Sequence, residues 1–148
     1  MAEPTGETGF SQGKLKVRVV TPERILIDTD ASSITLPGQA GVLEALPGAA
    51  PLLTAIGAGD LVVQGVSGGA GGEQKFIVAR GFAEILPDRV TVLVEYAEAP
   101  DKVDHAAAEQ QLQQGQKQQS GAGDDPAKYA AARMVVLEAE AKLGRAGQ

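Results

Sequence analysis

The first hundred residues of the chain consist of short apolar runs bounded by turn residues, and this pattern restricts the fold more than any other feature. The run KLKVRVV (residues 14–20) alternates, with Leu15, Val17 and Val19 on one side and basic residues on the other. A period of two is typical of a β-strand with one buried face. Further strand-like runs follow at residues 24–28, 32–36, 60–66, 74–80, 82–86 and 89–95. Repeated short strands with frequent turns favour a sandwich or a barrel.

A long apolar segment, GVLEALPGAAPLLTAIGAGDLVV (residues 41–63), interrupts this spacing. Only 3% of the residues are aromatic, so the core has to be aliphatic. We expect the large side chains of the segment to fill that core: Leu43, Leu46, Leu52, Leu53 and Ile56. Its prolines and glycines are expected to bend the chain between sheets, with Pro51 at a strand edge.

After about residue 100 the sequence changes to a helical composition. Residues 101–119 are rich in Ala and Gln, which suits a helix, and Asp101 or Asp104 can cap its start. Gly115 lies in the middle of this helix, at a cost of roughly 1 kcal/mol. The stretch SGAGDDP (residues 120–126) is a turn. The sequence therefore predicts one helix before this turn and, with it, the start of a helical hairpin.

Residues 127–144 form the second predicted helix of the hairpin. Pro126 fits its first turn, and Asp124 or Asp125 can cap it. One apolar face follows from the 4-3-4 spacing of Ala130, Met134, Leu137 and Ala141. The chain is thus expected to divide into a disordered acidic tail (1–13), a β-sandwich (14–99) and an antiparallel two-helix hairpin (100–148).

The residue types needed for several functions are scarce. A net charge of −6 argues against unassisted binding to nucleic acid or to an anionic membrane. The chain has no cysteine and a single histidine, His105, so we expect no metal site, no catalytic residue and no cofactor. The glycine-rich stretch at residues 65–76 lacks the phosphate-loop pattern and predicts a hairpin turn. No apolar run is long enough to span a membrane, and residues 1–13 lack the layout of a signal peptide.

Several blocks of the sequence resemble the ATP synthase epsilon subunit family in the correct order. LPGAAPLLTAIGAGDLVV (residues 46–63) is similar to the family signature L-P-G-H-A-P-L-L-T. KLKVRVVTPERILIDTDASSITLPGQAG (residues 14–41) resembles its opening strands and the V-V-T-P-E-R turn. IVARGFAEILPDRVTVLVEYAEAPDKVD (residues 77–104) resembles its G-F-x-E block. The likeness covers roughly residues 14–145.

The resemblance implies a fold that is mainly β with α, a ten-stranded β-sandwich followed by a two-helix hairpin. It implies a non-catalytic subunit of the central stalk that binds the gamma subunit and rests on the c-ring, coupling proton flow to ATP synthesis. The helices of bacterial members can reach the alpha and beta subunits and restrain ATP hydrolysis. Such a subunit would lie on the cytoplasmic side of the bacterial plasma membrane, held there only through the complex.

The resemblance also suggests interface residues. The ring-facing end of the family corresponds to a stretch with Gly38, Gly41, Val42, Leu43 and Glu44. Here Val42 replaces the usual acid, Glu44 stands at the usual second glycine, and Ala49 replaces the histidine after Pro-Gly.

Some members bind ATP on the hairpin through an I-D-x-x-R-A motif, and the matching stretch here is VDHAAA (residues 103–108). Asp104 is present, Ala107 replaces the arginine, and Arg133 matches an arginine of the second helix, which makes Asp104 and Arg133 the ATP-binding candidates. Residues 101–148 carry six Lys or Arg and seven Asp or Glu, a net charge of −1. A hairpin without excess charge is expected to restrain hydrolysis only weakly.

Two other readings stay open. A free-standing β-sandwich binding module with a helical appendage would ordinarily present clustered aromatic residues, and those of this chain are scattered. A small enzyme with an unrecognised site would have to work with one histidine and no cysteine.

Overall fold

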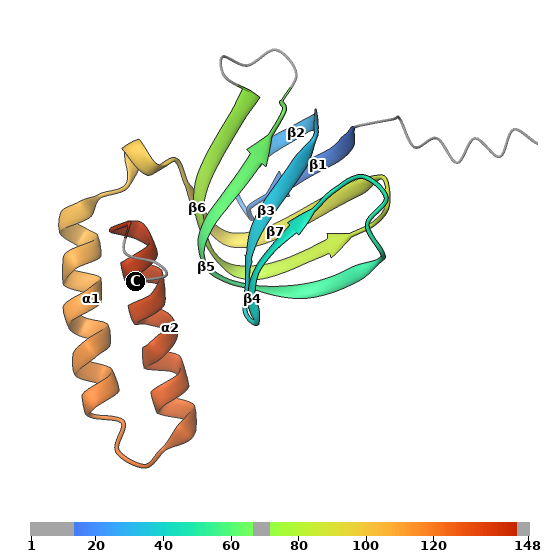
Figure 1. Ribbon diagram of the computed structural model, residues 1–148. Helices are drawn as coiled ribbons and strands as arrows, with labels where there is room; N and C mark the ends of the chain where they lie inside the picture. The colour runs from blue at the N-terminus through green and yellow to red at the C-terminus, as the bar shows by residue number, and fades with distance from the viewer. Residues whose placement is uncertain (1–13, 67–71, 145–148) are drawn as a thin grey trace, which may run out of the picture.

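The computed structural model describes residues 14–66 and 72–144, which form a β-sandwich followed by a helical hairpin (Figure 1). The predicted tail (1–13) and residues 67–71 of the predicted glycine-rich turn lie outside these residues. The elements, in chain order, are β1 (Leu15–Val20), β2 (Ile25–Ala31), β3 (Ser33–Gly38), β4 (Gly41–Ala45), β5 (Leu52–Gln64), β6 (Glu73–Ile85), β7 (Arg89–Glu98), the short 3-10 helix η2 (Pro100–Lys102), α1 (His105–Ser120) and α2 (Pro126–Lys142).

The strands of the described residues form one continuous sheet in the order β2-β1-β7-β6-β5-β3-β4. Neighbouring strands are antiparallel except β1 and β7, which are parallel. Strands β2 and β3 are consecutive in the chain yet lie far apart in this order. The backbone N–H of Ser32, between them, donates to the carbonyl of Gln64 at 2.8 Å. The sheet therefore curls on itself, and its two layers enclose one core (Figure 1).

The number of strands differs from the ten that the family resemblance implies, because the described residues form seven. The runs at residues 74–80 and 82–86, which look separate in sequence, join into the single long strand β6. Their junction is Arg80, whose φ of 60° is the only positive value at a non-glycine residue in the described chain. The next residue has to be glycine, since a Cβ at Gly81 would lie 1.9 Å from the carbonyl oxygen of Leu93. A bend thus replaces the break that the pattern predicts.

The sandwich core is aliphatic, as predicted, and includes the inward residues Leu15, Val17 and Val19 of β1. Ile56 is buried and Leu43 is partly buried. The expectation was wrong for the other three leucines of the long apolar segment, since Leu46, Leu52 and Leu53 are exposed by 53%, 48% and 71%. Leu46 lies in the loop before β5, and Leu52 and Leu53 are the first two residues of β5, which pair with β6 but not with β3.

The helical hairpin, defined as α1 and α2, begins at two of the predicted caps. The carboxylate of Asp104 accepts from the N–H of Ala107 at 3.0 Å, and that of Asp125 accepts from Ala127 at 3.0 Å. Gly115 has a packing role that the sequence did not reveal. A Cβ there would lie 2.9 Å from Val136 Cγ2, so glycine lets the two helices approach closely.

Helix α2 lies against the sandwich and α1 packs on the far side of α2 (Figure 1). The contact with the sheet includes Ala141 of α2, which packs with Ile77 of β6 and with Tyr96 of β7. Of the face predicted for this helix, Ala141 is buried and Ala130 is exposed, because the first half of α2 extends past the edge of the sheet. None of the helices in the described residues has the length and apolarity needed to cross a membrane.

Candidate functional site

The outer face of the sheet, the side turned away from the sandwich core, carries a row of apolar side chains. Val20 of β1 pairs with Leu93 of β7, Leu93 pairs with Phe82 of β6, and Phe82 pairs with Ala55 of β5. We call these four residues the apolar row. Phe82 is exposed by 59% and Leu93 by 53%. Bulky apolar side chains gathered on the surface of a soluble domain commonly mark an interaction site.

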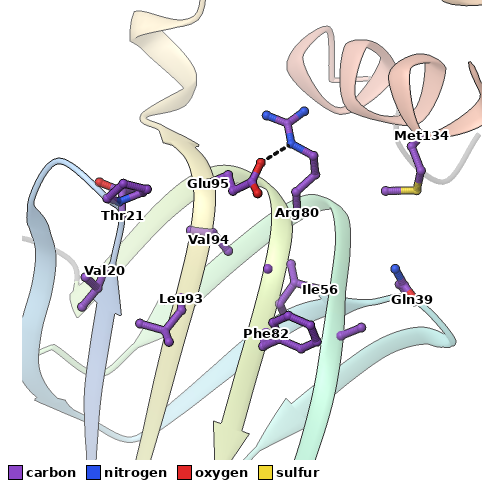
Figure 2. Close-up of a pocket in the computed structure, with 13 residues that line it drawn as sticks. Val20, Thr21, Gln39, Ile56, Arg80, Phe82, Leu93, Val94, Glu95 and Met134 are labelled. Carbon is purple, nitrogen blue, oxygen red and sulfur yellow. Dashed lines mark hydrogen bonds and ion pairs between the residues drawn. The ribbon is translucent and has the colours of Figure 1, made fainter. Parts of the chain in front are cut away.

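The apolar row lies in a groove of about 550 Å³, shown in Figure 2. The floor is formed by the sheet, and Met134 of α2 approaches from the side of the helical hairpin. We call this hollow the outer-face groove, and its principal lining residues are Ile56, Arg80, Phe82, Leu93, Glu95 and Met134. Phenylalanine, methionine and arginine are the side chains that protein interfaces concentrate, so the lining suits a protein partner.

Charged side chains flank the apolar row at both ends on the outer face of the sheet. At the hairpin end, Arg80 Nε donates to Glu95 Oε2 at 3.0 Å. At the other end, Glu84 extends outward two residues after Phe82 on the same strand, and it is exposed. Glu84 has no ion-pair partner within the described part of the chain. An apolar centre with a charged rim is the usual anatomy of a protein interface.

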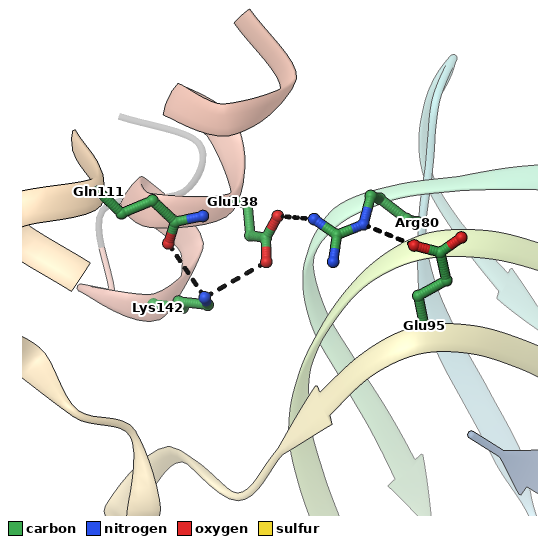
Figure 3. Close-up of polar contacts among 5 residues, drawn as sticks. All are labelled: Arg80, Glu95, Gln111, Glu138 and Lys142. Carbon is green, nitrogen blue, oxygen red and sulfur yellow. Dashed lines mark hydrogen bonds and ion pairs between the residues drawn. The ribbon is translucent and has the colours of Figure 1, made fainter. Parts of the chain in front are cut away.

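A polar network connects the groove to the hairpin, as Figure 3 shows. Glu138 of α2 is buried, and its carboxylate accepts a hydrogen bond from Arg80 Nη1 on β6. The same carboxylate lies 3.2 Å from Lys142 Nζ, which also donates to Gln111 of α1 at 3.0 Å. A buried carboxylate needs such partners, because an unpaired charge in the interior is costly.

Tyr96 of β7 contacts this network through Lys142. The ammonium of Lys142 stands 4.3 Å from the centre of its ring, within the range of a cation–π contact. Burial raises the pKa of the Tyr96 phenol above its ordinary value of 10.0, and the nearby carboxylates of Glu98 and Glu138 raise it further. Glu138 belongs to α2, so part of this rise in the pKa of Tyr96 depends on the contact between the hairpin and the sheet.

The five residues suggested for the ring-facing end lie around the β3–β4 turn. Val42 is exposed by 77% and Glu44 is also exposed, while Leu43 packs against the core. The two outward residues lie on one side of β4, an edge strand of the sheet. Gly38 is required by close packing, since a Cβ there would lie 2.8 Å from the carbonyl oxygen of Gly41. Gln39 of the same turn also lines the groove.

The two ATP-binding candidates lie at different levels of the hairpin. Asp104 is the N-cap of α1, next to the sheet. Arg133 is exposed on α2, two residues before the point where Val135 and Val136 meet Gly115. In the antiparallel pair this places Arg133 beside the distal half of α1, so the structure does not bring the two candidates together. The described residues contain no cluster of His, Asp and Glu that could hold a metal ion.

The sequence analysis missed the residues of the groove. A signal was present, because strict alternation in residues 82–86 and 89–95 places Ala83 and Val92 inward. The same alternation places Phe82 and Leu93 outward, where polar residues are expected. The sequence does not show which elements form the groove around these two residues. Met134, for example, lines it only because the hairpin folds back onto the sheet.

The chain is similar to known proteins over most of its length. A family model described as the β-sandwich domain of the ATP synthase delta/epsilon chain matches residues 14–100. The ATP synthase epsilon chain of Solibacter usitatus is 37% identical over 135 residues, which cover 89% of this chain and 95% of that protein. The epsilon chain of a Synechococcus strain is 45% identical over 104 residues, covering 70% of this chain and 72% of that one.

A solved structure shares the fold. A chain in the cryo-EM structure of the Euglena gracilis mitochondrial ATP synthase, determined with its c-ring, superposes with a TM-score of 0.72 at 16% identity. The match covers 89% of this chain and 81% of that chain. Since residues 14–99 are about three fifths of the chain, the shared fold extends into the helices.

Proposed function

Because the chain belongs to the family of ATP synthase delta and epsilon chains, we propose that it is the epsilon subunit of a bacterial ATP synthase. It has no catalytic role of its own. As a part of the central stalk it helps to couple proton flow to ATP synthesis, and it lies on the cytoplasmic side of the plasma membrane through the complex alone. The family membership supports this proposal, and the exposed apolar row is the single structural observation that carries it.

The gamma subunit is the partner that we assign to the outer-face groove. A stalk subunit has to bind its neighbour firmly enough to transmit torque, and such binding depends on apolar side chains that are buried on association. Phe82 and Leu93 provide that surface in the described residues, and both are more than half exposed in the isolated chain. The rim charges of Arg80, Glu84 and Glu95 would fix the orientation of the partner.

The c-ring is the second partner, and we assign it to the outward side of β4. Val42 and Glu44 are exposed there, next to the β3–β4 turn. Among the described strands β4 is the last in the sheet order, so its outer edge is accessible to another protein.

The hairpin is proposed to contact the alpha and beta subunits transiently and to restrain ATP hydrolysis weakly. Its removal should leave the sandwich intact, since the buried core cluster of the sandwich includes no residue of α1 or α2. A chain that ends after residue 100 should therefore still assemble and should raise the hydrolysis rate of the reconstituted enzyme modestly. An unchanged rate would rule out the restraint.

Binding to gamma is tested by size-exclusion chromatography of the full chain mixed with the gamma subunit of the same organism. We expect a stable one-to-one complex at micromolar concentration. Two separate peaks from two folded proteins would contradict the proposed function and would favour a free-standing binding module.

A further inference from the structure

A cleft of about 250 Å³ lies at the base of the helical hairpin, where α1, α2 and β7 meet. Tyr96 and Glu98 of β7 line it, and so does Lys142 of α2. The stretch that resembles the ATP motif of the family (residues 103–108) supplies four more lining residues, which are Val103, Asp104, Ala107 and Ala108. The cleft is therefore the position at which the family resemblance would place a bound ATP.

One of the two cations of this cleft, Lys142, is already held by groups of the chain itself. Its ammonium lies 3.2 Å from the buried carboxylate of Glu138 and donates to Gln111 Oε1 at 3.0 Å (Figure 3). It also stands 4.3 Å from the centre of the Tyr96 ring. Only 17% of the Lys142 side chain is exposed. Because an ammonium has three donors, Lys142 has little left to offer to a phosphate.

The start of α1 is also unavailable to an anion. Backbone N–H groups at the start of a helix are well placed to bind a phosphate. Here the N–H of Ala107 donates to Asp104 Oδ1 at 3.0 Å, so a carboxylate of the chain takes that position. Ala107 also stands where the family motif has arginine, and its methyl side chain adds no donor.

The charges around the cleft do not favour an anion either. The lining contains two acids, Glu98 and Asp104, and two bases, Lys102 and Lys142. Since Lys142 is paired with Glu138, Lys102 is the one lining cation without an ion-pair partner in the part of the chain that the structure describes. A triphosphate carries several negative charges and needs several cationic or N–H donors. The donors of this cleft therefore do not fit a nucleoside triphosphate.

We infer that Lys142 takes the place of a bound nucleotide in this chain, so that the hairpin packs on the sheet without a ligand and does not respond to ATP. The ammonium joins Gln111 of α1 and Glu138 of α2 to Tyr96 of β7. Glu138 extends the link to Arg80 of β6. The inference concerns the hairpin alone and does not depend on the partners proposed above.

Titration of the full chain with MgATP tests the inference directly. Calorimetry should detect no binding up to about 1 mM ATP, and the amides of α1 and α2 should exchange hydrogen at the same rate with and without ATP. Saturable binding below that concentration, or slower exchange in the two helices on addition of ATP, would overturn the inference. Either result would leave the proposed binding to gamma standing.

A pair of variants tests the role of Lys142 itself. Lys142→Met keeps a long side chain and removes the charge, so the amides of α1 and α2 should exchange faster by about 5-fold or more. Lys128→Met, on the exposed first turn of α2, is the matched control and should leave this exchange unchanged. Unaltered exchange in β1 and β2 would show that the sandwich of both variants is folded. Equal exchange of the helices in Lys142→Met and the unaltered chain would overturn the inference.

Discussion

Arg80 on β6 is hydrogen-bonded to the buried carboxylate of Glu138 on α2, and this contact joins the sandwich to the helical hairpin. In an Arg80→Ala variant Glu138 would keep Lys142 as its only ion-pair partner among the described residues. A buried polar group that loses a partner costs about 1–3 kcal/mol, so the hairpin should open more often. Hydrogen exchange would show faster exchange in α2 and unchanged exchange in β1 and β2, which lie away from the hairpin.

Arg133→Ala provides the control for that experiment, since Arg133 is exposed on α2 and takes no part in the network. It should leave the exchange of α2 unchanged. Equal exchange of α2 in the Arg80→Ala variant and the unaltered chain would show that the apolar contact of Ile77, Val103 and Ala141 is enough to hold the hairpin on the sheet.

The close approach of the two helices at Gly115 leads to a second prediction. Alanine is the better helix former by about 1 kcal/mol, yet its Cβ would lie 2.9 Å from Val136 Cγ2 and 3.0 Å from Val135 Cγ1. Valine side chains are stiff, and overpacking of this kind typically costs about 1–3 kcal/mol. Gly115→Ala should therefore destabilise the hairpin, seen as an earlier loss of helical circular dichroism on heating. Gln114→Ala, on the exposed side of α1, should not do so.

The bend of β6 gives a third prediction. A Cβ at Gly81 would lie 1.9 Å from the carbonyl oxygen of Leu93, whereas the nearest atom to a Cβ at Gly57 of β5 would be 3.6 Å away. Gly81→Ala should separate β6 from β7 and lower the free energy of unfolding by about 3 kcal/mol or more. Gly57→Ala is the matched control and should unfold at nearly the same urea concentration as the unaltered chain. Similar stability of the two variants would show that the bend can relax.

Tyr96 provides a prediction about pH. Burial and two carboxylates raise the pKa of its phenol above 10.0 in the folded chain, so the unfolded chain loses this proton at lower pH than the folded one. The corresponding stabilisation is complete below pH about 10 and is lost as the pH rises through the higher folded pKa. In a Tyr129→Phe variant, Tyr96 is the only tyrosine, and the absorbance of its phenolate can be followed directly.

The expected titration midpoint of Tyr96 in that variant lies above 10.0. The midpoint should move down toward 10.0 when Glu138→Gln is added. This change removes one carboxylate near Tyr96 and weakens the contact between α2 and Arg80 of the sheet. A midpoint at 10.0 before this change would mean that Tyr96 is not covered by the hairpin in solution.

Much of the fold could be predicted from the sequence because local rules determine it. The alternation in residues 14–20 correctly gave the inward residues of β1, and Asp104 and Asp125 were among the predicted helix caps. The exposure of Leu52 and Leu53 could not be predicted, because apolar composition alone does not show which residues of a strand face the core. The family resemblance was confirmed by the comparisons, whereas the ten strands it implies were not, since the described residues form seven.

The candidate site was less accessible to prediction, because its residues come from separate elements. Phe82 and Leu93 are cross-strand neighbours, Arg80 lies at an unusual backbone position, and Met134 arrives from α2. Such a site depends on the register of β6 and β7 and on the fold-back of the hairpin. The Arg80–Glu138 contact joins residues 58 positions apart, and no local pattern indicates it.

The affinity of the purified gamma subunit for the full chain, measured by calorimetry beside a Phe82→Ser variant, tests the central claim most directly. Phe82 is more than half exposed, so its replacement should leave the fold intact, and loss of a central interface residue typically costs about 2 kcal/mol. We predict tight one-to-one binding that Phe82→Ser weakens by about 30-fold and that Val42→Ser, an exposed apolar residue outside the groove, leaves unchanged. Equal affinity for gamma in the Phe82→Ser variant and the unaltered chain, or no binding by either, would contradict the account.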